Sequence, residues 1–86
     1  MAKYRITIKK SAAKELEALP KKDLRRIIKH IQSLADNPRP HGSQKLSGQE
    51  QYRIRQGDYR VVYSIEDKDL LVDIFKIGHR REIYRL

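Results

Sequence analysis

Hydrophobic and polar residues alternate at the start of the chain. Tyr4, Ile6 and Ile8 are separated by Arg5 and Thr7. This period of two is typical of a strand that buries one face and exposes the other. The sequence therefore predicts a half-buried strand at the beginning of the fold.

The spacing of apolar residues then becomes helical. Ser11 is the expected N-cap of a short helix that carries Ala12, Leu16 and Leu19. Pro20 cannot continue this helix because it lacks an amide hydrogen, but it suits the first turn of a following helix. Two consecutive helices are therefore predicted.

The second predicted helix is amphipathic. The apolar residues at helical spacing on one face are Leu24, Ile27, Ile28, Ile31, Leu34 and Ala35. The basic residues on or near the opposite face are Lys22, Arg25, Arg26 and Lys29. The helix is expected to end before Pro38, because Asn37 precedes a proline and is biased away from helical angles.

Three antiparallel strands are predicted in the second half of the chain, joined by Gln-Gly-Asp and Glu-Asp-Lys-Asp turns. The middle strand places Tyr59, Val61, Tyr63 and Ile65 on one face and Arg60, Val62 and Ser64 on the other. In the last strand, a charged residue falls on each of the two faces, Asp73 on one and Lys76 on the other, so neither face is apolar throughout. This break in the alternation indicates a β-bulge.

The predicted order of elements is β-α-α-β-β-β. We expect an α+β fold in which an N-terminal helical hairpin packs on one face of a small antiparallel sheet. Residues 1–86 are expected to form a single domain, because neither a linker nor an internal repeat divides the chain.

Composition narrows the functional classes. The net charge is +9, which favours an anionic partner such as nucleic acid, an acidic protein or an acidic membrane surface. A basic domain whose charge serves no function is the alternative. The chain has no cysteine, which excludes disulfides and thiolate metal sites and fits an intracellular location. Neither a signal peptide nor an apolar membrane span is predicted.

Arginine recurs on the first two of these later strands. If Tyr52 and Ile54 face the helices, then Arg53, Arg55 and Arg60 face away from them. Adjacent antiparallel strands would hold these three guanidinium groups close together. Like charges so placed reduce stability, and an anion is therefore expected among them.

The distribution of cation types supports a specific role for these arginines. Up to Glu50 the chain carries eight Lys and four Arg, and from Gln51 onward it carries two Lys and six Arg. Arginine is preferred where a phosphate is held by two hydrogen bonds or a base is stacked. Alternatively, the arginines form surface ion pairs with Asp58, Asp73 and Glu82.

The C-terminal segment continues the basic pattern with the letters GHRREIYRL. Gly78 allows the last strand to break, so that the segment brings Arg80 and Tyr84 over the arginine face. Taken by itself this segment is a weak signal, because a single His is usually an ordinary surface residue and a terminal Tyr usually packs.

The same segments carry a family resemblance. The stretches KLSG, YRIRQGDYRVVYSI and IGHRREIYRL together resemble the RelE/ParE superfamily of bacterial and archaeal toxins, most clearly its RelE branch of messenger-RNA interferases. The resemblance covers nearly the whole chain. ParE-type members share the fold and act on DNA gyrase, and a non-catalytic ParE-like inhibitor of DNA gyrase is therefore the alternative function.

The resemblance implies the toxin of a type II toxin–antitoxin system. Such a toxin is a ribosome-dependent endoribonuclease in which a 2′-hydroxyl attacks the adjacent phosphate of messenger RNA, without a metal or other cofactor. It implies that Arg53 and Arg55 contact the phosphates at the cleaved bond, where better-known members carry lysines. It further implies that Arg60 stabilises the scissile phosphate and that Arg80 is the catalytic arginine that follows the family's terminal glycine. Tyr84 would accept the proton of the 2′-hydroxyl or stack on a base.

Further residues are expected to bind RNA. Ser47 stands where the family carries an arginine, and Lys45 would substitute for it; His79 and Arg81 would also contact RNA. His79 is the alternative base to Tyr84, because an imidazole ordinarily titrates near pH 6.5. This set contains no paired histidines of a self-sufficient ribonuclease, which fits cleavage that depends on the ribosome for orientation.

The resemblance also implies the partners. A cognate acidic, partly helical antitoxin would neutralise the toxin, with a toxin–antitoxin heterotetramer as the expected assembly. It would bind the basic helix or a sheet edge, cover the arginines, or displace residues 80–86. The expected location is the cytoplasm, and the expected substrate is messenger RNA in the ribosomal decoding site. No membrane partner is expected.

Overall fold

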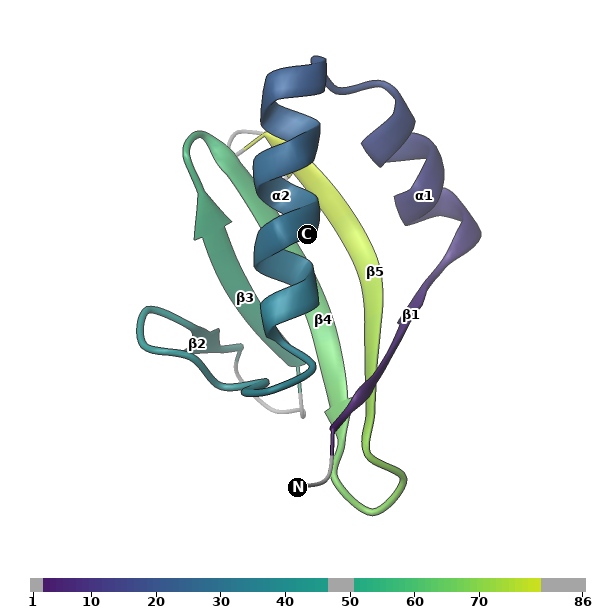
Figure 1. The fold of residues 1–86 in the computed structure, drawn as a ribbon, viewed down its shortest axis with the longest axis vertical. Coiled ribbons are helices and arrows are strands. Elements are labelled where there is room, and N and C mark those ends of the chain that lie inside the picture. The colour runs from purple at the N-terminus through teal and green to yellow at the C-terminus, as the bar shows by residue number, and fades with distance from the viewer. Residues whose placement is uncertain (1–2, 47–50, 80–86) are drawn as a thin grey trace.

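The computed structural model describes residues 3–46 and 51–79, which form two helices and five strands (Figure 1). The elements are β1 (Arg5–Ile8), α1 (Lys10–Glu17), α2 (Lys21–Ser33), β2 (Gln44–Lys45), β3 (Gln51–Gln56), β4 (Tyr59–Glu66) and β5 (Leu71–His79). Both helices precede the main part of the sheet, so the predicted α+β layout is confirmed. No helix in these ranges is long and apolar enough to cross a membrane.

The strands form one sheet in the order β1-β5-β4-β3-β2. The pairs β2–β3, β3–β4 and β4–β5 are antiparallel, whereas β1 pairs with β5 in parallel. This parallel pair and the two-residue strand β2 were not predicted. A strand of two residues is too short to show alternation, and the direction of pairing depends on the path of the helices between β1 and the later strands.

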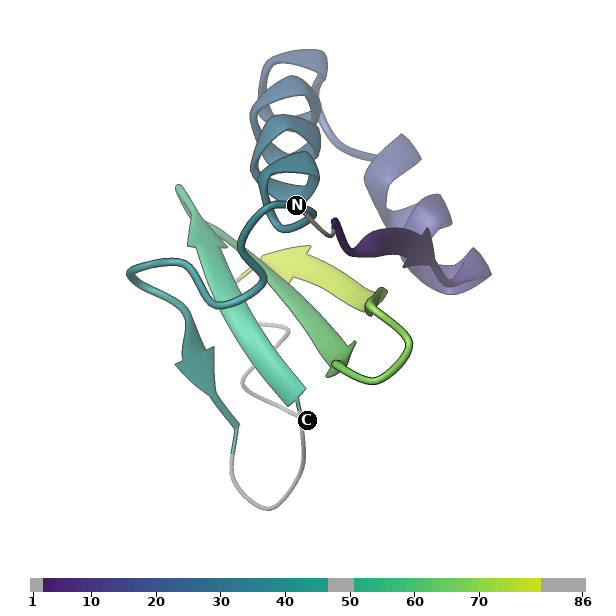
Figure 2. The same cartoon turned by 60° about the horizontal axis from the view of Figure 1, so that its bottom comes forward.

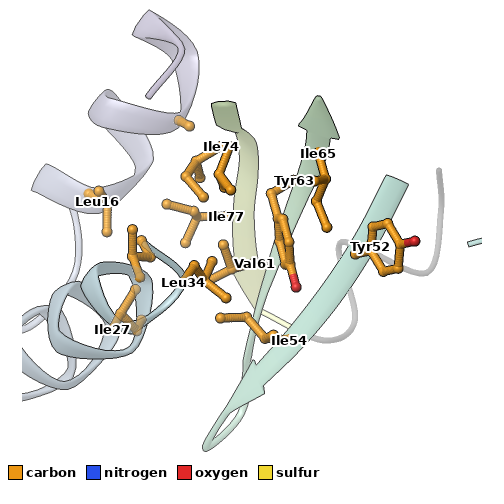
Figure 3. Close-up of a cluster of buried hydrophobic side chains, with 13 residues drawn as sticks. Leu16, Ile27, Leu34, Tyr52, Ile54, Val61, Tyr63, Ile65, Ile74 and Ile77 are labelled. Carbon is orange, nitrogen blue, oxygen red and sulfur yellow. The ribbon is translucent and has the colours of Figure 1, made fainter. Parts of the chain in front are cut away.

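The hydrophobic core lies between the sheet and the helical hairpin, which covers one face of the sheet (Figures 2 and 3). The fully buried side chains from both layers include Ile27, Leu34, Ile54, Val61, Tyr63, Ile74 and Ile77. The phenol of Tyr63 donates a hydrogen bond to the carbonyl oxygen of Pro38 at 2.7 Å. This bond satisfies a buried hydroxyl and attaches the chain after α2 to the centre of the sheet.

Two details of the predicted helices are wrong. The residue at the N-cap of α1 is Lys9, not Ser11, which lies in the first turn. Ile28 was expected on the buried face of α2 but is 38% exposed. The buried stripe of the helix runs through Ile27 and Ile31, and the residue after Ile27 turns about 100° away from it.

The predicted β-bulge in the last strand is confirmed. The register between β4 and β5 shifts between Val62, which lies opposite Lys76, and Tyr63, which lies opposite Ile74. Phe75 is therefore the additional residue. The bulge returns the residues beyond it to the correct parity, so that both ends of β5 present apolar side chains to the helices.

Candidate functional site

The sheet face opposite the helices carries the arginines of β3 and β4. Arg55 lies directly opposite Arg60 in the antiparallel register, and Arg53 lies opposite Val62. Tyr52 and Ile54, which alternate with them, are buried in the core. The sequence prediction that Arg53, Arg55 and Arg60 share one face is therefore confirmed.

A cavity of about 430 Å³ opens beside these arginines. Its lining consists of His30, His41, Gly42, Gln44, Arg53, Ile54, Arg55 and Arg60. The cavity forms at the outer edge of β3, because β2 pairs only with Tyr52 and Arg53. In the described part of the chain, no strand covers that edge beyond Arg53. The size falls within the range of small-molecule sites, which suits a nucleotide or a phosphate group.

Arg60 is the most unusual group in this cavity. It is only 3% exposed, and its Nη1 donates to the carbonyl oxygens of Tyr59 at 3.2 Å and Gly57 at 3.5 Å. Its Nε is buried and has no hydrogen-bond partner among the described residues. A buried guanidinium remains charged, so an unpartnered donor is costly unless an anion occupies the site.

Acidic side chains do not neutralise this pair of opposing arginines. Within the described ranges neither Arg55 nor Arg60 forms an ion pair with Asp58 or Asp73, and the carboxylate of Asp73 instead accepts a hydrogen bond from Thr7 at 3.0 Å. The alternative prediction of surface ion pairs is therefore not met for these two arginines. Its third carboxylate, Glu82, lies outside the described residues.

The side chain of Arg53 is oriented by β2. Gln44 lies opposite Arg53 in the register, and its Oε1 accepts a hydrogen bond from an Arg53 Nη2. Lys45 lies opposite Tyr52 in the register, so it does not share the sheet face of Gln44 and Arg53. Gln44, which the sequence did not single out, therefore lines the cavity, whereas Lys45 does not.

The loop that leads to the cavity is held by a polar cluster around Arg39. Arg39 donates to both carboxylate oxygens of Asp67, at 3.2 and 2.9 Å, and its Nε donates to the phenol oxygen of Tyr52 at 3.1 Å. The phenol of Tyr4 also donates to Asp67, at 2.6 Å. Hydrogen bonds from Arg39 and Tyr4 lower the pKa of Asp67. The loop after α2 is thus fixed to the turn between β4 and β5.

His79 is a predicted site residue that the structure places away from the cavity. The ring of His79 packs edge-on against Tyr59, with ring centroids 6.0 Å apart. Tyr59 itself packs against the core, so His79 lies on the helix side of the sheet and does not line the cavity. Arg80, Arg81 and Tyr84 lie outside the described residues.

Two histidines in the cavity were missed by sequence reasoning. His30 lies in the last turn of α2, and His41 lies in the loop between α2 and β2. They are eleven positions apart on different elements, so no local spacing connects them with the arginines. Only the fold brings them to the edge of β3. No group of His, Asp or Glu in residues 3–46 and 51–79 is arranged to hold a metal ion.

Known proteins resemble this chain over nearly its whole length. Residues 6–84 match the family described as the ParE toxin of the type II toxin–antitoxin system parDE. The chain is 32% identical to the RelE1 toxin of Methanocaldococcus jannaschii, over 96% of this chain and 97% of that one. It is 34% identical to the RelE toxin of Mycobacterium tuberculosis, over 96% of this chain and 88% of that one.

A solved structure shows the same architecture. The archaeal RelE–RelB complex of Pyrococcus horikoshii contains a chain that superimposes with a TM-score of 0.83 at 38% identity, covering 91% of this chain and 96% of that one. The relatives named here are RelE toxins, whereas the matching family is described by ParE. The chain therefore belongs to the RelE/ParE toxin superfamily of type II toxin–antitoxin systems.

Proposed function

We propose that this toxin is a messenger-RNA interferase that cleaves messenger in the ribosomal decoding site. The observation that carries this proposal is the cavity at the edge of β3, where Arg53, Arg55 and Arg60 gather. Within the part of the chain that the structure describes, the buried Nε of Arg60 has no partner there. Arg55 and Arg60 form no ion pair within the described residues, and no carboxylate belongs to the described lining of the cavity. This surplus of cationic donors matches the chemistry of a phosphate.

The cleavage step is attack of a 2′-hydroxyl on the adjacent phosphate. Negative charge grows on the phosphoryl oxygens as the 2′-oxygen bonds to phosphorus and the bond to the 5′-oxygen breaks. Fixed donors aimed at that charge stabilise the transition state without reorganising. Arg60 suits this role, because the carbonyl oxygens of Gly57 and Tyr59 already orient its guanidinium.

The family resemblance assigns the remaining roles. Arg80 and Tyr84 would complete the site from the C-terminal segment, and Lys45, His79 and Arg81 would contact RNA outside the cavity. The ribosome would hold the messenger in the orientation that in-line attack requires. The proposed location of the protein is accordingly the cytoplasm.

The proposed partner is an acidic antitoxin. The relative from Pyrococcus horikoshii forms a complex with RelB, and the +9 charge of this chain favours an acidic protein. The exposed basic side chains of Arg26 and Lys29 on α2 lead to the half-buried His30, which also lines the cavity. An antitoxin that crosses this surface would block the arginines. Two toxin–antitoxin pairs would form a heterotetramer.

A ParE-like inhibitor of DNA gyrase is the second candidate. The family match to ParE specifically favours it. A gyrase inhibitor needs a binding surface but no phosphate-cleaving centre. The buried and unpartnered Nε of Arg60 has no role in such a surface, and it therefore supports the nuclease proposal over this one.

Primer extension on a translated messenger tests the proposal. Wild-type toxin added to a translating extract should produce new 5′ ends within codons, and Arg60→Ala should not. Arg5→Ala is the matched control, because it removes an exposed arginine from the opposite edge of the sheet. Intact messenger together with gyrase-linked DNA breaks would instead support the ParE-like function.

A further inference from the structure

The outer edge of β5 loses its partner strand halfway along its length. β1 pairs with β5 only from Leu71 to Ile74, and where this pairing ends the amide of Lys9 donates to the carbonyl oxygen of Ile74 at 2.8 Å. The chain then enters α1, which packs against β5 (Figure 1). In the described part of the chain, no strand pairs with this edge beyond Ile74. The backbone amides that point outward there need another partner.

A carboxylate of α1 takes the place of the missing strand. Oε1 of Glu15 accepts a hydrogen bond from the amide of Ile77 at 3.3 Å, and Oε2 lies 3.7 Å from Nζ of Lys76. The side chain of Ile77 is fully buried, and the side chain of Glu15 is only 29% exposed. An amide in such surroundings is costly to leave without an acceptor. Glu15 therefore holds the part of β5 that β1 does not reach.

The segment that Glu15 holds lies directly beside Arg60. Ile77 lies opposite Val61 in the antiparallel register, and Gly78 lies opposite Arg60. The backbone groups of successive strand residues point to alternate sides. Because the amide of Ile77 points outward to Glu15, the amide of Gly78 points toward β4. Gly78 is buried and carries no side chain, so its backbone is the flank that β5 presents to Arg60.

The β-bulge leaves this flank with little other support. The register between β4 and β5 shifts between Val62 and Tyr63, and beyond that shift only residues 76–79 of β5 pair with β4. A bulge disrupts the hydrogen bonding of the ladder and bends the strand. The position of β5 next to Arg60 therefore depends on this short pairing and on the contacts with α1.

The same segment leads into the C-terminal residues. Arg80 and Tyr84, to which the resemblance assigns catalytic roles, follow His79 in the sequence and lie outside the described residues. The end of β5 thus has two connections to the chemistry. It flanks Arg60 through Gly78, and it sets the point from which the C-terminal segment begins.

We propose that Glu15 is a positioning residue for the cleavage reaction, an inference that rests on the function proposed above. Glu15 does not line the cavity. It acts through the backbone of β5, because its bond to the Ile77 amide keeps Gly78 opposite Arg60. Donors that stabilise a transition state must stay at fixed positions, and a displacement of about 1 Å slows a reaction by up to about 10²-fold.

Single-turnover cleavage of ribosome-bound messenger tests this role. Glu15→Ala should slow cleavage at saturating ribosomes by about 10- to 10²-fold, with no change in the ribosome concentration that gives half the maximal rate. Glu15→Gln should cleave nearly as fast as wild type, because its amide oxygen still accepts the bond from Ile77 although the charge pair with Lys76 is lost. Glu17→Ala is the matched control, because it removes an exposed carboxylate from the same helix.

Two further measurements separate positioning from a general loss of stability. Tyr63→Phe removes a different buried hydrogen bond, and it should lower the urea midpoint without slowing cleavage. Amide hydrogen exchange reports the contact itself. In Glu15→Ala, exchange at Ile77 should accelerate more than exchange at the buried Ile27 of α2, whereas Glu15→Gln should keep both amides protected.

The outcomes distinguish the two proposals. A wild-type protein that cleaves no messenger overturns the nuclease function, and the positioning role with it. A wild-type protein that cleaves, while a folded Glu15→Ala variant cleaves as fast as Glu17→Ala, overturns the role of Glu15 alone. Equally slow cleavage by Glu15→Gln and Glu15→Ala also overturns it, because the bond to the Ile77 amide would then not be the contact that matters.

Discussion

Arg39 and Arg60 show two opposite uses of the same side chain. Arg39 is 39% exposed at its side chain and pairs with both oxygens of Asp67. Arg60 is 3% exposed, and no carboxylate forms an ion pair with it in the described part of the chain. The exposed cation is fully partnered and the buried one is not.

This contrast separates a structural arginine from a functional one. A bidentate pair such as Arg39–Asp67 joins two loops and requires nothing further. A buried guanidinium held only by backbone carbonyls among the described residues remains charged, and an anion that enters the cavity would give its Nε a partner. This arrangement lowers the stability of the free protein, and it is found at sites where a ligand provides the counter-charge.

The largest expected effect comes from replacing Arg60 with alanine. Arg60→Ala should reduce cleavage of ribosome-bound messenger by ~10²-fold or more, because it removes a donor to the developing charge. Its unfolding midpoint in urea should stay near that of wild type, since an unpaired buried charge leaves with the side chain. Single-turnover cleavage and urea unfolding of the same preparations measure both effects.

Arg39→Ala provides the reciprocal measurement. This variant should lower the urea midpoint, because the loop after α2 loses its link to Asp67, and it should retain most of the cleavage rate. A folded Arg60→Ala that cleaves like wild type would remove this residue from the chemistry, and the contrast between the two arginines would then have no functional meaning.

The strands were largely predictable because side chains that face the core alternate along a strand with side chains that face away from it. Alternation placed Tyr52 and Ile54 in the core and the arginines on the other face, and the break in alternation near Asp73 located the bulge. The prediction failed for Ile28, because periodicity alone gives a buried face wider than the surface that the sheet covers. Its exposed fraction depends on packing that no helical spacing records.

The candidate site was only partly predictable. Sequence spacing brought Arg53, Arg55 and Arg60 together because a hairpin joins their strands, which is a local arrangement. It could not bring His30 and His41 to the same cavity, because that depends on how α2 and the following loop pack against the edge of β3. The shortness of β2, which leaves this edge open, also has no sequence signal.

A smaller effect is expected from the buried phenol of Tyr63, which is hydrogen-bonded to the loop that carries Arg39. Tyr63→Phe removes the hydrogen bond to the carbonyl oxygen of Pro38 and leaves that acceptor without the phenol. We expect a loss of about 1–2 kcal/mol in the free energy of unfolding, the usual cost of such a bond. Urea unfolding measures it, with cleavage unchanged.

The phenol also has a spectroscopic signature. Burial raises the pKa of Tyr63 to about 12, so this group should ionise at a higher pH than an ordinary phenol when absorbance near 295 nm is followed. The late component should disappear in Tyr63→Phe. If the full titration of the variant matches that of wild type, Tyr63 is not the buried group that the hydrogen bond to Pro38 requires.

The smallest expected effect is the acid dependence of the Arg39 cluster. Hydrogen bonds from Arg39 and Tyr4 lower the pKa of Asp67 below that of the unfolded chain. Its contribution to stability is therefore fully present above the unfolded pKa, near 4, and is lost as the pH falls through the lower folded value. Wild type should lose more unfolding free energy between pH 6 and pH 3 than Asp67→Asn does. The difference should be modest because the carboxylate is exposed and screened by solvent. Equal losses in the two proteins would mean that the Arg39–Asp67 pair contributes nothing in solution, and Arg39 would then offer no structural counterpart to Arg60.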